Sequence, residues 1–329
     1  MPSNIRHMVT VSVVVPAYNS GGLLRRALGS ALSQTVEDLE CLVVDDGSVE
    51  DLSWVAHHDD RRVHYLRQVN RGVSVARNVG VLNASGTFVA FLDQDDEWRR
   101  NKLELQLRRL EEAPGASFCY TGFDWVRPGL TARATPQDIT YRGLLSDQHV
   151  CLSSVLMQRS TYLSVGGHDP LLRVMQDYDL FLRLSRFAAP LGVEESLVLY
   201  HLHDANVSAD YRTAARERFR LIQAHRDVAE RSGDQLTIVA CDAGLRRTRE
   251  LYGLQALDAA RAAHSSRCSG SAQPRDDHRL VAAGRCRADP APAACRQTSS
   301  ANGSAVTHLV GVDNVFQGEF LTAFQRQPT

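Results

Sequence analysis

Three carboxylates directly follow an apolar stretch in the first third of the chain. The residues from Thr87 to Leu92 have the composition of a buried strand, and Asp93-Gln94-Asp95-Asp96 comes immediately after them. Carboxylates crowded at the edge of an apolar core repel one another and are costly to desolvate, so they persist where a cation neutralises them. Oxygen ligands favour a hard ion such as Mg²⁺ or Mn²⁺, which in turn favours a diphosphate. The segment therefore predicts a site for a cation and a diphosphate; the alternative is a solvated acidic turn.

Two more polar segments follow apolar ones in the same way. Pro16-Ala17-Tyr18-Asn19 comes after Val11–Val15, and Asp45-Asp46-Gly47-Ser48 comes after Leu39–Val44. Continuously apolar, β-branched stretches are typical of parallel strands that are covered on both faces. If these stretches are parallel strands of one sheet, the three polar loops meet at its carboxyl edge, where such sheets bind ligands.

The elements that must position these loops alternate between strand and helix. Apolar residues recur with helical spacing from Leu23 to Leu32, and again in Lys102–Glu112. A short strand is predicted near Val63–Leu66, and a helix at Val75–Gly80 leads to the strand at Phe88. This order predicts an α/β fold with a Rossmann-like, mixed but mainly parallel sheet flanked by helices.

The second half of the chain carries one further acidic feature. A strand is predicted at Phe118–Val126, a loop at Pro128–Gln137 and an ordered block at 150–187. This block ends in a helix that opens with Asp177 and Asp179, where the helix dipole favours acids. Helical patterns continue at 209–233 and 245–263. The stretch 265–304 is nearly free of large apolar residues and is expected to be disordered.

The composition limits the classes of partner. The chain has 329 residues, of which 43% are hydrophobic, enough for a large core. Its 37 basic and 38 acidic residues give a net charge of −1, so we expect no nucleic acid partner. The first residues do not resemble a signal peptide, and no apolar run reaches the roughly 18 residues of a membrane span. We expect a cytoplasmic protein; association with the inner face of a membrane stays open, and the oligomeric state is not indicated.

Taken together, the motifs resemble those of the family 2 inverting glycosyltransferases, which have the type A nucleotide-sugar-binding fold. The resemblance extends from Val11 to Ser208 and rests on the order and spacing of Val13–Asn19, Val43–Ser48, Gly72 with Ala76–Gly80, Leu92–Trp98, Gly166-Gly167, Gln176–Leu180, and His203 with Asn206 and Ser208. It implies a metal-dependent enzyme that transfers a sugar from a nucleoside-diphosphate sugar to an acceptor hydroxyl. The implied donor is a UDP- or dTDP-sugar, and the implied cofactor is Mn²⁺ or Mg²⁺.

The resemblance also implies roles for residues of the first two loops. It assigns the nucleotide to Pro16, Ala17, Tyr18, Asn19 and Asp45. A carboxylate can accept the imide N–H of uracil or thymine, and a tyrosine ring can lie against the base. The alternative for Asp45 is an Asx turn before Gly47, and for Tyr18 an aromatic side chain at the rim.

For the acidic segment, the resemblance places Asp93 near the ribose, Gln94 in the nucleotide-sugar site and Asp95 on the metal. His203 would approach the metal or the diphosphate, and its alternative is an ordinary surface histidine, as we expect for His201. Arg77 would face the nucleotide, and its alternative is a solvated arginine on a helix. We expect Asp96 to cap a turn and Trp98 to lie in the core.

Asp177 resembles the catalytic base of the family. It would take the proton of the acceptor hydroxyl as that oxygen attacks the anomeric carbon opposite the diphosphate, and a single displacement inverts the configuration. Asp179 is expected to be only a first-turn acid. The chain departs from the family at Gln176, where Glu is usual, and at His168, where a large aromatic residue commonly follows the paired glycines. The first change removes a negative charge beside the base, and the second bears on local packing.

The implied domain organisation has three parts. A glycosyltransferase domain spans 9–209, with a nucleotide-sugar-binding half at 9–98 and an acceptor-binding half at 99–209. A helical extension follows at 210–264, and a low-complexity tail at 265–329.

Three other functions are weighed against transfer. Gln176 and the tail favour a non-catalytic or degraded nucleotide-sugar-binding homologue. A sugar-phosphate nucleotidyltransferase is expected to have a glycine-rich basic loop after its first strand, which Pro16–Asn19 is not. A glycoside hydrolase has no need of the nucleotide-side motifs.

Overall fold

The computed structural model describes residues 9–127, 130–134, 138–202 and 210–269. The motif residues His203, Asn206 and Ser208 lie outside this range, as does the predicted tail beyond Ser269.

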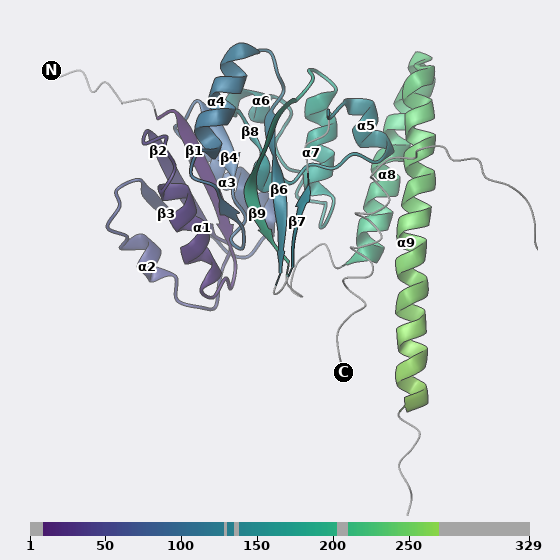
Figure 1. Cartoon of the computed structure of the whole chain (residues 1–329), viewed down its shortest axis with the longest axis horizontal. Coiled ribbons are helices and arrows are strands. Elements are labelled where there is room, and N and C mark those ends of the chain that lie inside the picture. The colour runs from purple at the N-terminus through teal and green to yellow at the C-terminus, as the bar shows by residue number, and fades with distance from the viewer. Residues whose placement is uncertain (1–8, 128–129, 135–137, 203–209, 270–329) are drawn as a thin grey trace, which may run out of the picture. The chain divides into compact units, whose positions relative to one another are not determined.

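A nine-stranded mixed sheet forms the centre of the described structure (Figure 1). The strand order is β3-β2-β1-β4-β8-β6-β9-β5, and β7 pairs with β6. Four neighbouring strands are parallel to one another: β1 (Val11–Ala17), β2 (Leu39–Asp45), β3 (Val63–Arg67) and β4 (Phe88–Phe91). The others are β5 (Glu97–Trp98), β6 (Cys119–Arg127), β7 (Leu130–Ala134), β8 (Leu156–Gln158) and β9 (Leu191–His201). The β6 and β9 strands are parallel, while β8 is antiparallel to both β4 and β6.

Helices cover both faces of the sheet, and each face has its own apolar core. Alternation along β1 sends Val13 and Val15 into one core and Val14 into the other, because successive side chains of a strand point to opposite faces. The first core is covered by α1 (Leu23–Leu32), α2 (Ser53–Ala56) and α4 (Lys102–Glu112). The second is covered by α3 (Val73–Asn83), α5 (Tyr141–Ser146), α6 (Arg159–Ser164) and α7 (Gln176–Ser185).

Two long helices complete the second core. α8 (Tyr211–Ser232) contributes Ile222, and α9 (Gln235–Ser269) contributes Cys241 and Leu245. The side chain of Arg218 on α8 donates to the carbonyl of Ser146 at the end of α5. The helices α8 and α9 therefore share a core with α5 and α7.

The structure confirms the predicted α/β class, with its predominantly parallel sheet between helices. The prediction of a loop over Pro128–Gln137 is wrong for Leu130–Ala134, which form β7. In β7 the small and apolar residues alternate with Thr131 and Arg133, and the strand pairs antiparallel with the end of β6. Because two of its five residues, Thr131 and Arg133, are polar, this segment was not recognised as a strand from its sequence. Helix α9 also begins ten residues before the predicted Leu245, at Gln235.

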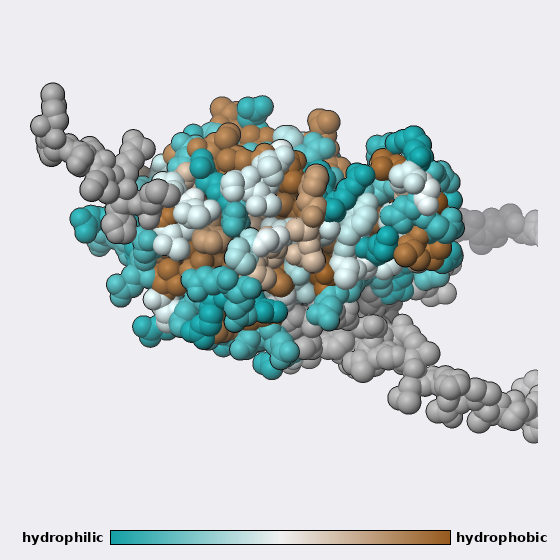
Figure 2. Space-filling model, turned by 90° about the horizontal axis from the view of Figure 1, so that it is seen from above, coloured by the Kyte–Doolittle hydropathy of each residue, from teal (hydrophilic) through white to brown (hydrophobic). Residues whose placement is uncertain are grey.

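No helix of the described residues is long and apolar enough to cross a membrane. On the face shown in Figure 2, groups of hydrophobic residues lie between hydrophilic ones.

Candidate active site

The loops after β1, β2 and β4 meet at the carboxyl edge of the sheet, as the sequence predicts. Parallel pairing places Ala17 opposite Asp45, and the amide of Asp46 donates to the carbonyl of Ala17 at 2.8 Å. The Gln94 side chain accepts from the amide of Tyr18 at 2.8 Å, which joins the first loop to the acidic segment. Hydrogen bonding also joins the first two loops, because the Asn19 side chain accepts from the amide of Val49.

The residues of the first loop differ in exposure. Pro16 and Ala17 are buried within β1, whereas 46% of Tyr18 is exposed at the rim. The ring of Tyr18 is therefore accessible to a ligand from solvent. The roles of these residues in nucleotide binding stay predictions.

Asp45 is completely buried and surrounded by protein donors. One carboxylate oxygen accepts from the amide of Ser48, and the other accepts from the Tyr65 hydroxyl at 2.6 Å and from Arg67 at 2.8 Å. Burial alone would raise the pKa of Asp45, but these hydrogen bonds and the charge of Arg67 outweigh it and lower the pKa. The bond to Ser48 is the Asx-type turn given above as the alternative, so a ligand must share Asp45 with these donors.

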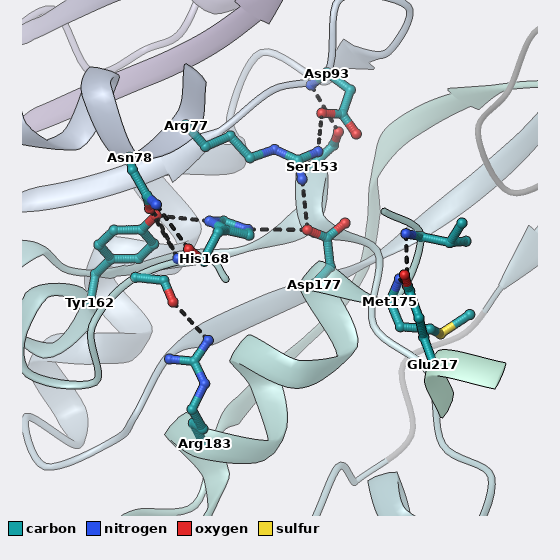
Figure 3. Close-up of polar contacts among 12 residues, drawn as sticks. Arg77, Asn78, Asp93, Ser153, Tyr162, His168, Met175, Asp177, Arg183 and Glu217 are labelled. Carbon is teal, nitrogen blue, oxygen red and sulfur yellow. Dashed lines mark hydrogen bonds and ion pairs between the residues drawn. The ribbon is translucent and has the colours of Figure 1, made fainter. Parts of the chain in front are cut away.

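Arg77 connects the acidic segment to the proposed base (Figure 3). Its Nη2 lies 2.7 Å from Oδ1 of Asp93, and its Nη1 lies 2.7 Å from Oδ1 of Asp177. Only 4% of the Arg77 side chain is exposed, which rules out the solvated arginine considered above. The cation is buried because its α3 position, beside Ala76, faces the second core. Arg77 thus holds together two carboxylates that are 84 positions apart (177 − 93).

Asp177 lies in the first turn of α7, and 29% of its side chain is exposed. Its Oδ1 accepts from Arg77 and contacts Nε2 of His168 at 3.1 Å. Among the described residues, none is hydrogen-bonded to Oδ2. Burial tends to raise the pKa of Asp177, but the charge of Arg77, the largest of the opposing effects, outweighs it and lowers the pKa. The carboxylate is therefore ionised at neutral pH, with one oxygen held and the other available.

The acidic segment has an excess of negative charge. Burial and the charges of Asp177 and Asp95 raise the pKa of Asp93, even though Arg77 opposes them. Burial and the charges of Asp93 and Asp95 raise the pKa of Asp96 well above its ordinary value. Asp96 accepts from the Ser153 hydroxyl and from the amide of His201, so it ties the turn to β9, as expected of a structural residue. Trp98 is buried in the core, also as expected.

The chain resembles known proteins in sequence and, separately, in fold. A family model, Glycosyl transferase family 2, matches residues 12–146. The putative teichuronic acid biosynthesis glycosyltransferase TuaG of Bacillus subtilis is 31% identical over 218 residues, which cover 63% of this chain and 84% of that protein. The chain belongs to glycosyl transferase family 2.

Other relatives cover smaller parts of this family 2 chain. WfgD of Escherichia coli, a UDP-Glc:alpha-D-GlcNAc-diphosphoundecaprenol beta-1,3-glucosyltransferase, is 35% identical over 151 residues, or 44% of this chain and 59% of that protein. The chain spans only 19% and 16% of the length of two uncharacterized rickettsial glycosyltransferases that it matches. The crystal structure of S. aureus TarS 1-349 in complex with UDP-GlcNAc superimposes with a TM-score of 0.53 at 18% identity, covering 65% of this chain and 66% of that one. The predicted type A fold is thereby confirmed.

The donor set of this family 2 chain fits a hard divalent cation. Asp93, Asp95 and Asp96 offer only oxygen ligands, and burial together with the charge of Asp95 raises the pKa of the other two, so negative charge is crowded in this segment. Within residues 9–127, 130–134, 138–202 and 210–269, no three His, Cys, Asp or Glu side chains are grouped to hold a metal. Asp95 is the proposed protein ligand, and the other proposed ligand, His203, lies outside these ranges.

Two residues of this site were not predicted from the sequence. His168 is 1% exposed and contacts Asp177; the paired glycines before it were the signal that the chain turns sharply here. Glu217 of α8 accepts from the backbone amides of residues 173, 174 and 175, at 2.9, 3.0 and 2.9 Å, directly before α7 (Figure 3). No sequence signal distinguishes Glu217 from the other charged residues of its helix.

His201, expected at the surface, is half-buried, and its Nε2 lies 2.8 Å from Glu97.

Proposed function

We propose that this chain is a metal-dependent, inverting glycosyltransferase that transfers a sugar from a nucleoside-diphosphate sugar to an acceptor hydroxyl, with Asp177 as general base. The observation that carries the proposal is the double contact of Arg77 with Asp93 and Asp177. It places an ionised, partly exposed carboxylate beside the acidic segment where the donor diphosphate is expected. A nucleotide-binding protein without transfer chemistry has no need of a base at this position.

The geometry suits a single displacement. The acceptor O–H bond breaks and its proton goes to Oδ2 of Asp177, because Oδ1 is held by Arg77. The acceptor oxygen forms a bond to the anomeric carbon, and the bond from that carbon to the diphosphate breaks, with its electron pair leaving on the diphosphate. A bound Mg²⁺ or Mn²⁺ would neutralise charge on the leaving diphosphate. General-base assistance is typically worth about 10² to 10⁴ in rate.

Several observations support a UDP- or dTDP-sugar as donor. The structure that superimposes on this chain was solved with UDP-GlcNAc, and WfgD is named for UDP-Glc. WfgD is also named for a β-linkage to a lipid diphosphate-linked sugar, which supports a glycan hydroxyl, free or lipid-linked, as acceptor. The exposed ring of Tyr18 is available to lie against the base of such a donor. A lipid-linked acceptor would bring the protein to the inner face of a membrane.

A panel of nucleoside-diphosphate sugars tests the proposal. Thermal unfolding with Mn²⁺ and each donor identifies the base and sugar that bind, since a ligand that binds only the folded state raises the melting temperature. Release of nucleoside diphosphate from that donor, and the anomeric configuration of the product by NMR, then test transfer and inversion. We expect one donor to be turned over with inversion. Retention of configuration would refute the single displacement.

The second candidate is a nucleotide-sugar-binding protein without turnover, which Gln176 favours. This side chain is 5% exposed, and its Oε1 has no hydrogen-bond partner in the described part of the chain. Tight donor binding with no turnover by the wild type would favour this candidate.

A further inference from the structure

His168 lies between the proposed base and a buried chain of hydrogen-bonding groups (Figure 3). Its Nε2 is 3.1 Å from Oδ1 of Asp177, and its Nδ1 is 2.8 Å from the hydroxyl of Tyr162. That hydroxyl is in turn 2.5 Å from Oδ1 of Asn78. Both His168 and Tyr162 are only 1% exposed, so water does not complete these contacts from the surface.

The orientation of the Asn78 amide is fixed by the backbone. Its Nδ2 donates to the carbonyl of His168 at 2.8 Å, and its Oδ1 accepts from the amide of His168 at 3.0 Å. Oδ1 can only accept hydrogen bonds, so the proton of its contact with Tyr162 must come from the phenol. Gly167 allows this approach, because a Cβ there would be 2.6 Å from Oδ1 of Asn78.

The hydrogen-bonded groups from Asp177 to Asn78 hold fewer protons than their contacts need. The three contacts from Asp177 through His168 and Tyr162 to Asn78 need three protons. The phenol supplies one and a neutral imidazole supplies one. Since the phenol donates to Asn78, we assign the single proton of the neutral imidazole to the shorter of its two contacts, from Nδ1 to the phenol oxygen at 2.8 Å. Nε2 then presents a lone pair to the Asp177 carboxylate at 3.1 Å. With Asp177 ionised, this series of three contacts holds one proton too few, and the contact without a proton is the one between Asp177 and His168.

We propose that His168 is a positioning residue that shares with Asp177 the proton taken from the acceptor, so that the pair acts as one base. This inference rests on the proposed function. The broken O–H bond of the acceptor gives its proton to the carboxylate. A half-turn of the carboxylic acid then places that proton in the contact with Nε2 of His168. All three contacts now hold a proton. The extra proton is released to water after the product has left the site.

The surroundings of His168 keep the imidazole neutral before the reaction. Burial and the charges of nearby arginines lower its pKa below the ordinary 6.5, against the opposing effect of Asp177. The groups that face it are Arg77 and Asn78 from α3, the Phe91 ring from β4, Tyr162 from α6, and Asp177 and Arg183 from α7. A neutral imidazole can take a proton and an imidazolium cannot, so kcat should fall as His168 becomes protonated at acid pH.

The test compares kcat between pH 4.5 and 8 for the wild type, His168→Gln and Tyr162→Phe, with donor Kd measured for each. Glutamine can donate to Asp177 but cannot take up a proton. We expect His168→Gln to lower kcat at least tenfold at pH 7, with donor Kd unchanged, and to remove the acid limb of the wild-type profile. If it does not fold, Tyr162→Phe, which keeps the imidazole but breaks the link to Asn78, should lower kcat in the same way.

Two results would overturn the inference. If His168→Gln keeps the wild-type kcat and pH profile and loses only thermal stability, His168 is a packing residue, while the proposed function stands. If the wild type transfers sugar from no donor that it binds, the proposed function fails and the inference with it.

Discussion

Nη1 of Arg77 lies 2.7 Å from Oδ1 of Asp177, so a cation in the middle of α3 is paired with a first-turn carboxylate of α7. The same guanidinium also binds Asp93 after β4. One buried side chain therefore sets the distance between the acidic segment and the proposed base.

Replacing Arg77 should damage both stability and catalysis. Arg77→Met removes a buried cation from two carboxylates that are each 29% exposed, so the loss of unfolding free energy should be at the low end of the roughly 3 to 5 kcal/mol that breaking a fully buried pair costs. Urea denaturation at pH 7 measures this loss. Arg77→Lys keeps the charge but not the planar fork, so its unfolding free energy should lie between those of the wild type and Arg77→Met. Equal stability of all three proteins would contradict the structure.

The pairing has a defined pH window. Because the pKa of Asp177 is lowered below 3.8, its pairing stabilises the fold above pH 3.8, and this contribution disappears as the pH falls through the lower folded-state pKa. In Arg77→Met, burial without the cation raises the pKa of both carboxylates, so the variant takes up protons at a higher pH than the wild type. The difference in stability between the two proteins should therefore shrink steadily as the pH falls from neutral into the acid range.

Lys102 should make stability rise with pH. It is completely buried over the Trp98 ring, its Nζ donates to Gln106, and burial lowers its pKa from 10.5 to about 7. Between pH 7 and 10.5 the unfolded chain binds more protons at this position than the folded one, so the unfolding free energy increases with pH.

The matched variant is Lys102→Met. It should be more stable than the wild type at pH 7 by about 2 kcal/mol, since each pKa unit corresponds to about 1.4 kcal/mol and the partner of Gln106 is lost. The advantage over the wild type should decline toward pH 10. A difference that does not change with pH would show that Lys102 does not titrate in this window.

The paired glycines should respond unequally to substitution. Both have left-handed backbone, with φ of +87° at Gly166 and +69° at Gly167. A Cβ on Gly166 meets open space, so Gly166→Ala should cost only about 1 to 2 kcal/mol of strain. Gly167→Ala also meets Asn78 and Tyr162 and should cost roughly 2 kcal/mol more. Thermal unfolding measures both, and equal losses would contradict the close packing at Gly167.

Glu217 should act on the site from α8. Its carboxylate accepts from three consecutive amides before α7, and glutamine offers only one acceptor oxygen. We expect Glu217→Gln to cost about 2 kcal/mol of stability and to lower kcat, because the start of α7 carries Asp177. The exposed Glu230→Gln on the same helix is the control and should change neither. Wild-type kcat in Glu217→Gln would show that α8 does not position the base.

Local patterns account for most of the fold that was predicted. The mainly apolar stretches at Val11–Val15 and Leu39–Val44 form β1 and β2, whose two faces are both covered, and the helical spacing after Leu23 corresponds to α1. The acidic segment was found because carboxylates crowded at the edge of an apolar core are costly unless a cation neutralises them. Strand β7 was missed because its polar side chains are exposed and its pairing with β6 is a tertiary contact.

The connections within the site could not be predicted in the same way. That Arg77 binds Asp177, and that Glu217 holds the start of α7, depends on elements brought together by the second core. His168 was noted as a departure from the family pattern, but its contact with Asp177 follows only from the turn at Gly166 and Gly167.

The most direct measurement of the central claim compares transfer and donor binding in Asp177→Asn and the wild type. Asparagine keeps the size of the side chain but cannot take the acceptor proton. With a donor found by thermal shift and Mn²⁺ present, we predict that kcat falls by about 10² to 10⁴ while donor Kd stays within about threefold. Wild-type transfer by Asp177→Asn would contradict the assignment of Asp177 as the base.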